Sequence, residues 1–359
     1  MLYRTVRLRW PFSLVWWTVL IVDANASWWW MGISASGSIS GNSVSPSCSR
    51  VPGLSLQQLR MCLQKPDVIP SVSQGANIGI HECKKQFKYE RWNCSTSNDP
   101  TVFGTLLKIA HKESAFVYAI TSAGVVHAVG KSCSKGNLTE CSCESKRGAR
   151  NQPKGWEWGG CSDNVNYGVW LSKTFVDAPE KADRRARSQR KARAMMNLHN
   201  NEAGREAVLA LMRVQCRCHG VSSSCAVKTC SKSLPKFEEV GEALKAEYKD
   251  AIRAVYIKRK RKLKRKDNKK LRIPSSSLVY LDESPNYCYR DKKLGIDGTS
   301  GRECNKNSSG VDGCDLLCCG SGYNTQTVRS VHSCHCRFIW CCNVVCKKCE
   351  KIFDRYTCK

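Results

Sequence analysis

The chain has 359 residues, with 58 lysines and arginines against 30 aspartates and glutamates, so its formal net charge is +28. This excess of positive charge predicts an anionic partner. No stretch reaches the roughly 18 uncharged apolar residues that a membrane span requires, and the 24 cysteines allow up to twelve disulfide bonds.

The N-terminus has the features of a secretory signal peptide. Three arginines precede an apolar stretch over residues 10–22, and Ala-Asn-Ala at 24–26 offers a small-residue cleavage site. We expect residues 1–26 to be removed and the protein to be secreted through the endoplasmic reticulum into the extracellular space and matrix; a signal anchor is the alternative. Three glycosylation sequons agree with export, at Asn93, Asn137 and Asn307.

Helical patterns dominate the first half of the mature chain. Residues 105–129 are long, apolar and free of proline, which is typical of a buried helix. Helical periodicity continues over 166–176, 192–214 and 234–256. We expect a mainly α N-terminal domain over residues 27–252, long enough to bury an ordinary core.

Four cysteines in residues 216–230 (CRCHGVSSSCAVKTC) predict a hairpin that projects from this domain. Cys216 with Cys230 and Cys218 with Cys225 form nearly concentric pairs, and Gly220 allows a tight turn. Such a disulfide-linked hairpin holds a serine hydroxyl away from the body of the protein. A disulfide-linked loop with no further role is the alternative.

A basic run over residues 253–272 contains KRKRKLKRK and predicts a linker. We expect it to be a solvated, disordered tether over 258–270. Its lack of interleaved aromatic residues disfavours nucleic acid, whereas a secreted chain meets heparan sulfate. The expected heparan-binding residues are Lys258, Arg259, Lys260, Arg261, Lys262, Lys264, Arg265 and Lys266, and a second basic cluster spans 184–193.

Residues 288–358 hold twelve cysteines and few apolar residues, so disulfides must replace a large core. We expect a small disulfide-rich β domain over 273–359. Nested cysteine pairs predict a finger hairpin over 334–349 with adjacent cysteines at its tip. The cysteine spacing also fits a zinc knuckle, but secreted thiols oxidise, so no metal is expected.

Long motifs in this chain closely resemble the Wnt family of secreted lipid-modified signalling proteins. They are RWNC at 91–94, ESAF at 113–116, MNLHNNEAGR at 196–205, the cysteine loop at 218–230, GTSGREC at 298–304, DGCDLLCCG at 312–320 and FIWCC at 338–342. The resemblance implies a helical domain with a lipid-bearing thumb hairpin and a cysteine-rich domain with an index finger. It further implies a ligand that triggers Wnt signalling in development and cell fate.

The resemblance also implies partners and site residues. Ser222 is the serine that Porcupine would acylate with palmitoleate, and no other cofactor is expected. Wntless would carry the acylated protein, and a Frizzled cysteine-rich domain with an LDL-receptor-related co-receptor would receive it. The implied receptor contacts are Val221, Ser222, Phe338, Ile339, Trp340, Cys341, Cys342 and Val344.

The resemblance implies a set of disulfide bonds as well. In the first domain they are Cys83–Cys94, Cys133–Cys141, Cys143–Cys161, Cys216–Cys230 and Cys218–Cys225. In the second they are Cys288–Cys319, Cys304–Cys314, Cys318–Cys358, Cys334–Cys349, Cys336–Cys346 and Cys341–Cys342. Cys48 and Cys62 are left to pair with each other.

The chain departs from the family pattern at two positions. Ser223 stands where the family has glycine, and Ser231 where it has tryptophan.

An enzyme with Ser222 and His219 is disfavoured because no Gly-x-Ser-x-Gly elbow is present. A heparan-sulfate-binding matrix protein without receptor agonism is the alternative function. The alternative to a receptor contact is that the apolar residues of the finger pack internally beneath the hairpin.

Overall fold

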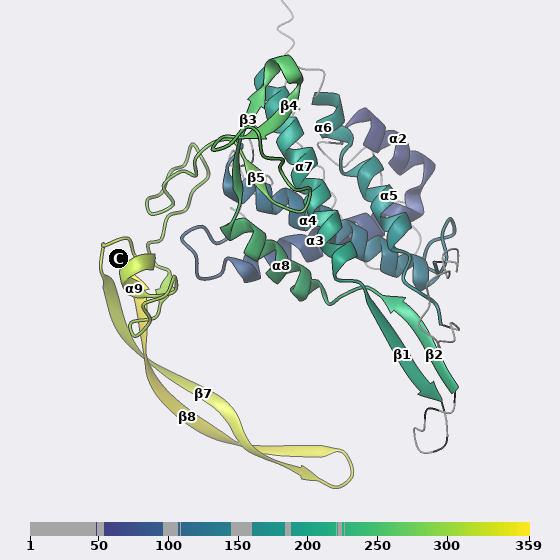
Figure 1. Ribbon diagram of the computed structural model, residues 1–359. Helices are drawn as coiled ribbons and strands as arrows, with labels where there is room; N and C mark the ends of the chain where they lie inside the picture. Colours follow the sequence, from purple (N-terminus) through teal and green to yellow (C-terminus); the bar gives the residue numbers. More distant parts are fainter. Residues whose placement is uncertain are drawn as a thin grey trace, which may run out of the picture.

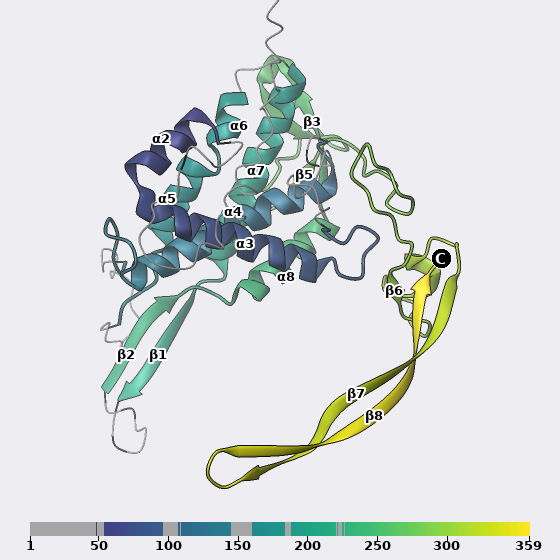
Figure 2. The same cartoon turned by 180° about the vertical axis from the view of Figure 1, so that it is seen from behind.

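The computed structural model describes residues 48, 54–95, 107, 109–144, 160–183, 188–219, 221, 225 and 227–359. A helical body carries one β-hairpin, and a small C-terminal part beside the body carries a longer one; both hairpins extend past the same end of the body and stay apart from each other (Figures 1 and 2). This architecture confirms the expected fold class, a mainly α part with a disulfide-linked hairpin and a small disulfide-rich β part. No helix in the described ranges is long and apolar enough to cross a bilayer.

The body and the C-terminal part consist of the following elements. The body contains α2 (Leu56–Gln64), η2 (Pro66–Val68), α3 (Ile69–Gln86), α4 (Lys112–Ser134), α5 (Val165–Phe175), α6 (Ala178–Asp183), α7 (Ser188–Ala210), β1 (Arg213–His219), β2 (Val227–Ser233), α8 (Phe237–Lys249), β3 (Ile252–Ile257), η6 (Lys258–Lys260), β4 (Lys262–Arg265) and β5 (Val279–Tyr280). The C-terminal part contains β6 (Glu303–Cys304), α9 (Cys314–Leu317), β7 (Tyr323–Ile339) and β8 (Asn343–Cys358).

Helix α4 is the centre of the body. It is buried around its whole circumference, as its continuous apolar sequence predicts. The helix begins at Lys112 because the side chain of His111 accepts a hydrogen bond from the Ser114 N–H and caps its first turn. Helices α3, α5, α7 and α8 all pack against α4.

Glycines bring the neighbouring backbones into direct contact with α4. A Cβ atom on Gly204 of α7 would lie 1.9 Å from the carbonyl oxygen of Ala119. A Cβ on Gly124 of α4 would lie 2.2 Å from the carbonyl oxygen of Gly75 on α3. Because any larger residue would push these helices apart, the glycines set the spacing of the core.

A buried ion pair joins α7 to the end of α5. Arg205 is only 2% exposed, and its two terminal nitrogens donate to the Asp177 carboxylate at 3.0 and 3.2 Å. The same side chain donates to Ser122 on α4 at 3.3 Å and to Glu202 at 2.8 Å. The Arg205 guanidinium therefore links its own helix α7 to α4 and to the end of α5.

The expectation that the basic run is a disordered tether is wrong. Strands β3 and β4 pair antiparallel with Ala254 opposite Arg265 and Ile257 opposite Lys262. The run is ordered because residues 252–257 (IRAVYI) are rich in β-branched and aromatic side chains, which favour a strand. Ala254 packs with Met196 and Val279 in a small cluster, so the hairpin is anchored on α7.

The expected helix over 234–256 is too long, because its C-terminal end is part of strand β3. Helix α8 ends at Lys249, and the chain turns into β3 at Ile252. Strand β3 also pairs in parallel with β5, and Leu278 packs in the main core. The expected domain limits at residues 252 and 273 stay a prediction.

Replacing Arg205 with methionine should strongly destabilise the helical body. The substitution keeps much of the side-chain volume but leaves the charge of Asp177 buried without its partner, which costs about 3–5 kcal/mol. Denaturant unfolding of the purified protein, followed by far-UV circular dichroism, measures this loss.

The matched control is Arg213→Met, because Arg213 is exposed and its ion pair with Glu239 lies at the surface. Its cost should stay below about 1 kcal/mol. Equal stability losses for the two variants would contradict the assigned role of Arg205.

Candidate binding site on two disulfide-linked hairpins

The β1–β2 hairpin is held by the two nested disulfides that the cysteine spacing predicts. Cys216 lies directly opposite Cys230 in the strand register and is bonded to it. Cys218 is bonded to Cys225 one step nearer the tip. At the tip Val221 is 89% exposed, whereas Ser222 lies outside the described residues.

A polar clamp fixes this hairpin on the body. The Asp163 N–H donates to the Lys232 carbonyl at 2.9 Å, and the Lys232 N–H donates to the Ser162 hydroxyl at 3.0 Å. The Asp163 carboxylate accepts from the Leu234 N–H at 2.9 Å. Burial opposes its ionisation, but hydrogen bonds from Ser134 and Leu234 lower the pKa of Asp163 overall.

Sequence reasoning missed this clamp. Ser162 and Asp163 directly follow Cys161, whose disulfide to Cys143 holds the segment beside the base of the hairpin. A serine and an aspartate after a half-cystine are a weak signal, because short polar residues are common in loops. The clamp is recognisable only once the fold brings Lys232 and Leu234 to it.

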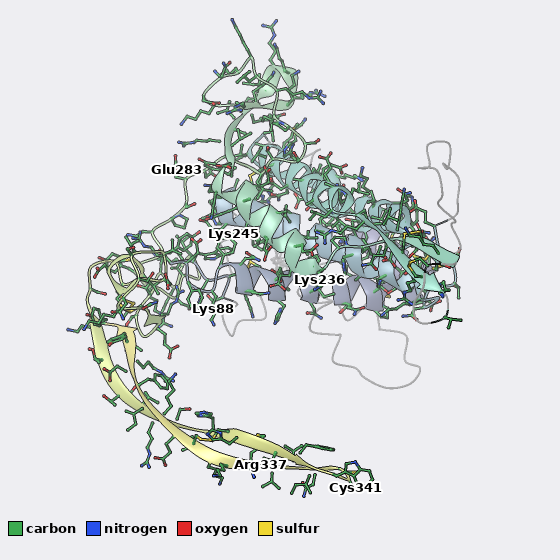
Figure 3. All side chains as sticks on the ribbon, turned by 60° about the horizontal axis from the view of Figure 1, so that its bottom comes forward. Lys88, Lys236, Lys245, Glu283, Arg337 and Cys341 are labelled. Atoms are coloured by element: carbon green, nitrogen blue, oxygen red, sulfur yellow. A yellow bond between two sulfur atoms is a disulfide. The ribbon has the colours of Figure 1, made fainter. Side chains whose placement is uncertain are left out.

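The β7–β8 hairpin is the longer of the two, with strands of 17 and 16 residues. Disulfides Cys334–Cys349 and Cys336–Cys346 cross-link its distal half. A register shift lies between Cys334 and Arg337, so the strands bend just before the tip. Figure 3 shows Arg337 and Cys341 at the far end of the hairpin, well away from the body.

The tip of this hairpin is an exposed apolar patch. Trp340 is 90% exposed and Phe338 is 69% exposed. The other large apolar side chains exposed there are Ile339, Val344 and Val345. The alternative that these residues pack beneath the hairpin is therefore wrong. Exposed apolar groups at one rigid tip indicate a contact surface for a partner.

The predicted disulfide bond between Cys341 and Cys342 is absent from this structure, so that prediction is wrong. Both cysteines are free and exposed, and their sulfur atoms lie 3.5 Å apart, well beyond the ~2.05 Å of a disulfide. Both residues have positive φ, 72° and 85°. With Trp340 they form the turn between Ile339 and Asn343, which leaves the two sulfurs within hydrogen-bond distance but not covalently bonded.

The other expected disulfides are all present. Besides those of the hairpins, they are Cys48–Cys62, Cys83–Cys94, Cys133–Cys141, Cys143–Cys161, Cys288–Cys319, Cys304–Cys314 and Cys318–Cys358. The nested cysteines of the finger are consumed by disulfides, so they offer no thiolates for the zinc knuckle that their spacing resembles.

One arginine joins the C-terminal part to the body. Arg302 donates to the carbonyl of Arg91 at 2.7 Å and to that of Lys88 at 3.1 Å. Arg91 in turn donates to the Leu316 carbonyl at 3.1 Å. Burial lowers the pKa of Arg302 from its usual value. Lys88 lies on the side of the body that faces the C-terminal part (Figure 3), so this contact helps to set the spacing between the hairpins.

The remaining predicted residues lie on the surface. Asn137 and Asn307 are exposed, and Asn93 is half-buried. Residues 258–262 are exposed at the turn of the β3–β4 hairpin, whereas Lys264 and Arg265 are half-buried. This hairpin lies at the end of the body opposite the β1–β2 hairpin (Figures 1 and 2).

Comparisons with known proteins agree on one family. A family model described as "wnt family" matches residues 50–359. Protein Wnt-16 of Bos taurus is 49% identical over 343 residues, which cover 94% of this chain and 93% of that protein. Protein Wnt-5b of Mus musculus is 44% identical over 348 residues, 96% of each chain.

A solved structure matches as well. A chain in the structure of human WLS in complex with WNT8A has a TM-score of 0.57 and 41% sequence identity, and the match covers 81% of this chain and 94% of that one. Since the family model spans most of the sequence and the relatives align over nearly their whole length, this chain belongs to the Wnt family of signalling ligands.

Proposed function

We propose that this Wnt family ligand is secreted, carries palmitoleate on Ser222 and grips the cysteine-rich domain of a Frizzled receptor with both hairpins. The observation that carries the proposal is the pair of disulfide-linked hairpins, which extend past the same end of the body (Figure 1). Val221 on the first and Trp340 on the second are exposed. Two rigid arms with a gap between them suit a single partner domain held from two sides.

The lipid supplies the largest single contribution to receptor affinity. A sixteen-carbon chain at about 0.8 kcal/mol per buried CH₂ offers on the order of 10 kcal/mol when a receptor groove covers it. The hairpin supports an attachment role for Ser222 because neighbouring His219 is exposed and no carboxylate of the described residues pairs with it. A serine without an adjacent base is a poor nucleophile, so an acyltransferase such as Porcupine would supply the base that its acylation requires.

The finger tip supplies the second contact. Burial of a large aromatic side chain at the centre of an interface is a common source of binding energy. Trp340, Phe338 and Ile339 offer such a group on a tip that disulfides keep rigid. Because the hairpin is already ordered before binding, binding carries no entropic cost for ordering it.

Further partners follow from the lipid and from the charge. An exposed acyl chain needs a carrier, and the relative WNT8A was solved in complex with human WLS; we propose Wntless for this chain as well. An LDL-receptor-related co-receptor completes the proposed assembly. Heparan sulfate would bind the exposed basic residues 258–262, at the opposite end of the body from the hairpin tips. The alternative of a matrix protein without receptor agonism has no support among the relatives, which are Wnt ligands.

Ser222→Ala should remove the acyl group, carrier-dependent secretion and signalling together, while the fold is retained. Ser223→Ala is the matched control, because it changes the neighbouring hydroxyl in the same loop. Mass spectrometry of the peptide that contains residues 219–224, together with a signalling reporter assay, measures both effects. Normal signalling by a protein whose 219–224 peptide is unmodified would rule out the lipid mechanism.

Trp340→Ala should weaken binding to a purified Frizzled cysteine-rich domain by about 1–3 kcal/mol, the usual cost of losing an aromatic anchor. Secretion should persist, because the exposed side chain supports no core. Trp170→Ala is the control, since Trp170 is also exposed but lies on α5 of the body. Surface plasmon resonance measures the affinities, and an unchanged affinity for Trp340→Ala would exclude the finger contact.

Replacing the lysines and arginines of residues 258–266 with glutamine should lower the salt concentration that elutes the protein from heparin. Exposed charges act over about 10 Å at 0.1 M salt, so the attraction is screened as salt rises. Affinity for the Frizzled domain should stay unchanged, which serves as the internal control. Elution at the parental salt concentration would move the glycan site to the basic cluster at 184–193.

A further inference from the structure

The turn of the β3–β4 hairpin presents four consecutive basic residues, Lys258 to Arg261, followed by Lys262. All five residues are exposed, and the described residues provide none of them with an ion pair. The turn also lies at the end of the body opposite the β1–β2 hairpin (Figures 1 and 2). A macromolecule can therefore reach it while the hairpin tips are occupied.

We infer that the peptide bond between Arg261 and Lys262 is a processing site for an endoprotease of the secretory route that cuts after paired basic residues. In the reaction water adds across the peptide bond and the C–N bond breaks. Arg261 then ends in a carboxylate and Lys262 begins with an amino group. The inference rests on the proposed secretion, which brings the chain into contact with such enzymes.

The structure and the local sequence distinguish Arg261 from the other arginines of the run. Arg259 is exposed in the same turn, but it has one basic residue before it, Lys258, which itself follows Ile257. Arg265 also follows a lysine, but it is half-buried in β4, and its guanidinium donates to the Asp267 carboxylate at 3.1 and 2.9 Å. Arg253 is half-buried in β3 and ion-paired with Glu283. Arg272 follows a leucine. Only Arg261 among these combines an exposed side chain, basic residues at the three preceding positions and a place in a turn.

The turn is held by few interactions, so it can open to enter a protease cleft. Arg261 has a left-handed backbone with φ of 49° and ψ of 40°, and its N–H donates to the Lys258 carbonyl at 3.3 Å. The adjoining strand pair ends with Ile257 opposite Lys262. Exposed tips of this kind are preferred sites of proteolytic cleavage, because they open locally without unfolding the protein.

Cleavage there would divide the protein into two parts without a covalent link. The disulfide nearest to the turn on its N-terminal side is Cys216–Cys230, and the nearest on its C-terminal side is Cys288–Cys319. All 24 cysteines are either in a disulfide on one side of the turn or free at the finger tip.

Non-covalent contacts would keep the two parts together in the folded state. Asn200 exchanges hydrogen bonds with the Val279 backbone at 2.9 and 3.0 Å, and Arg302 holds the Arg91 carbonyl. The cut protein thus keeps both hairpins but loses the chain that ties them. The affinity of the cut protein for a receptor would then depend on the strength of the non-covalent contacts between the two parts.

Analysis of the secreted full-length protein with a C-terminal tag tests this inference. We expect a denaturing gel without reductant to show a separate C-terminal fragment, and N-terminal sequencing to begin at Lys262. Arg261→Gln should lose this fragment, whereas the matched control Arg265→Gln should keep it. A fragment that begins at Lys266, or one that persists in Arg261→Gln, would overturn the assignment.

A second measurement separates this inference from the proposed function. Purified intact protein is incubated with a purified endoprotease that is specific for paired basic residues, and circular dichroism first verifies that Arg261→Gln is folded. Cleavage at Arg261 in the parental protein, with loss of cleavage in the variant, supports the site independently of the cellular route. Resistance of the folded parental protein would refute it, although secretion and receptor binding would stand.

Discussion

Strands β7 and β8 extend far from the body with most of their side chains in solvent, so burial of apolar surface cannot hold them together. Isolated two-stranded hairpins are marginally stable in water. Cross-links supply what a core would otherwise provide, because Cys334–Cys349 and Cys336–Cys346 reduce the freedom of the unfolded hairpin. The same principle applies to β1–β2. The proposed recognition depends on tips that these disulfides hold in place.

Rigid arms are useful only when their bases are fixed, and the body provides this. The clamp around Asp163 fixes the base of β1–β2, and the joint around Arg302 holds the part that carries β7–β8. Both rest on helices that pack tightly around α4, where glycines allow backbone contact. Tyr248 on α8 and Ser284 after β5 both donate to the buried Glu113 of α4. These hydrogen bonds tie α8 and the segment after β5 to the central helix.

The sequence predicts those features that depend on local spacing. Concentric cysteines predict both hairpins, and the uninterrupted apolar run predicts the central helix, although its N-terminal limit depends on the capping interaction of His111. The ordered basic hairpin was missed because its charges suggest a solvated chain, whereas its order comes from contacts of Ala254 with Met196 and Val279. The free thiols of Cys341 and Cys342 depend on the backbone of one turn, which residue identity does not reveal. Ser222 stays a prediction, since it lies outside the described residues.

If the proposed function is correct, both hairpins engage one receptor domain at the same time. Hydrogen–deuterium exchange of the protein, alone and in complex with a Frizzled cysteine-rich domain, tests it most directly. We expect slower exchange in two separate segments, residues 216–230 and residues 334–349, with little change in the basic hairpin. Protection of only one of these segments, or of the helical body instead, would contradict it.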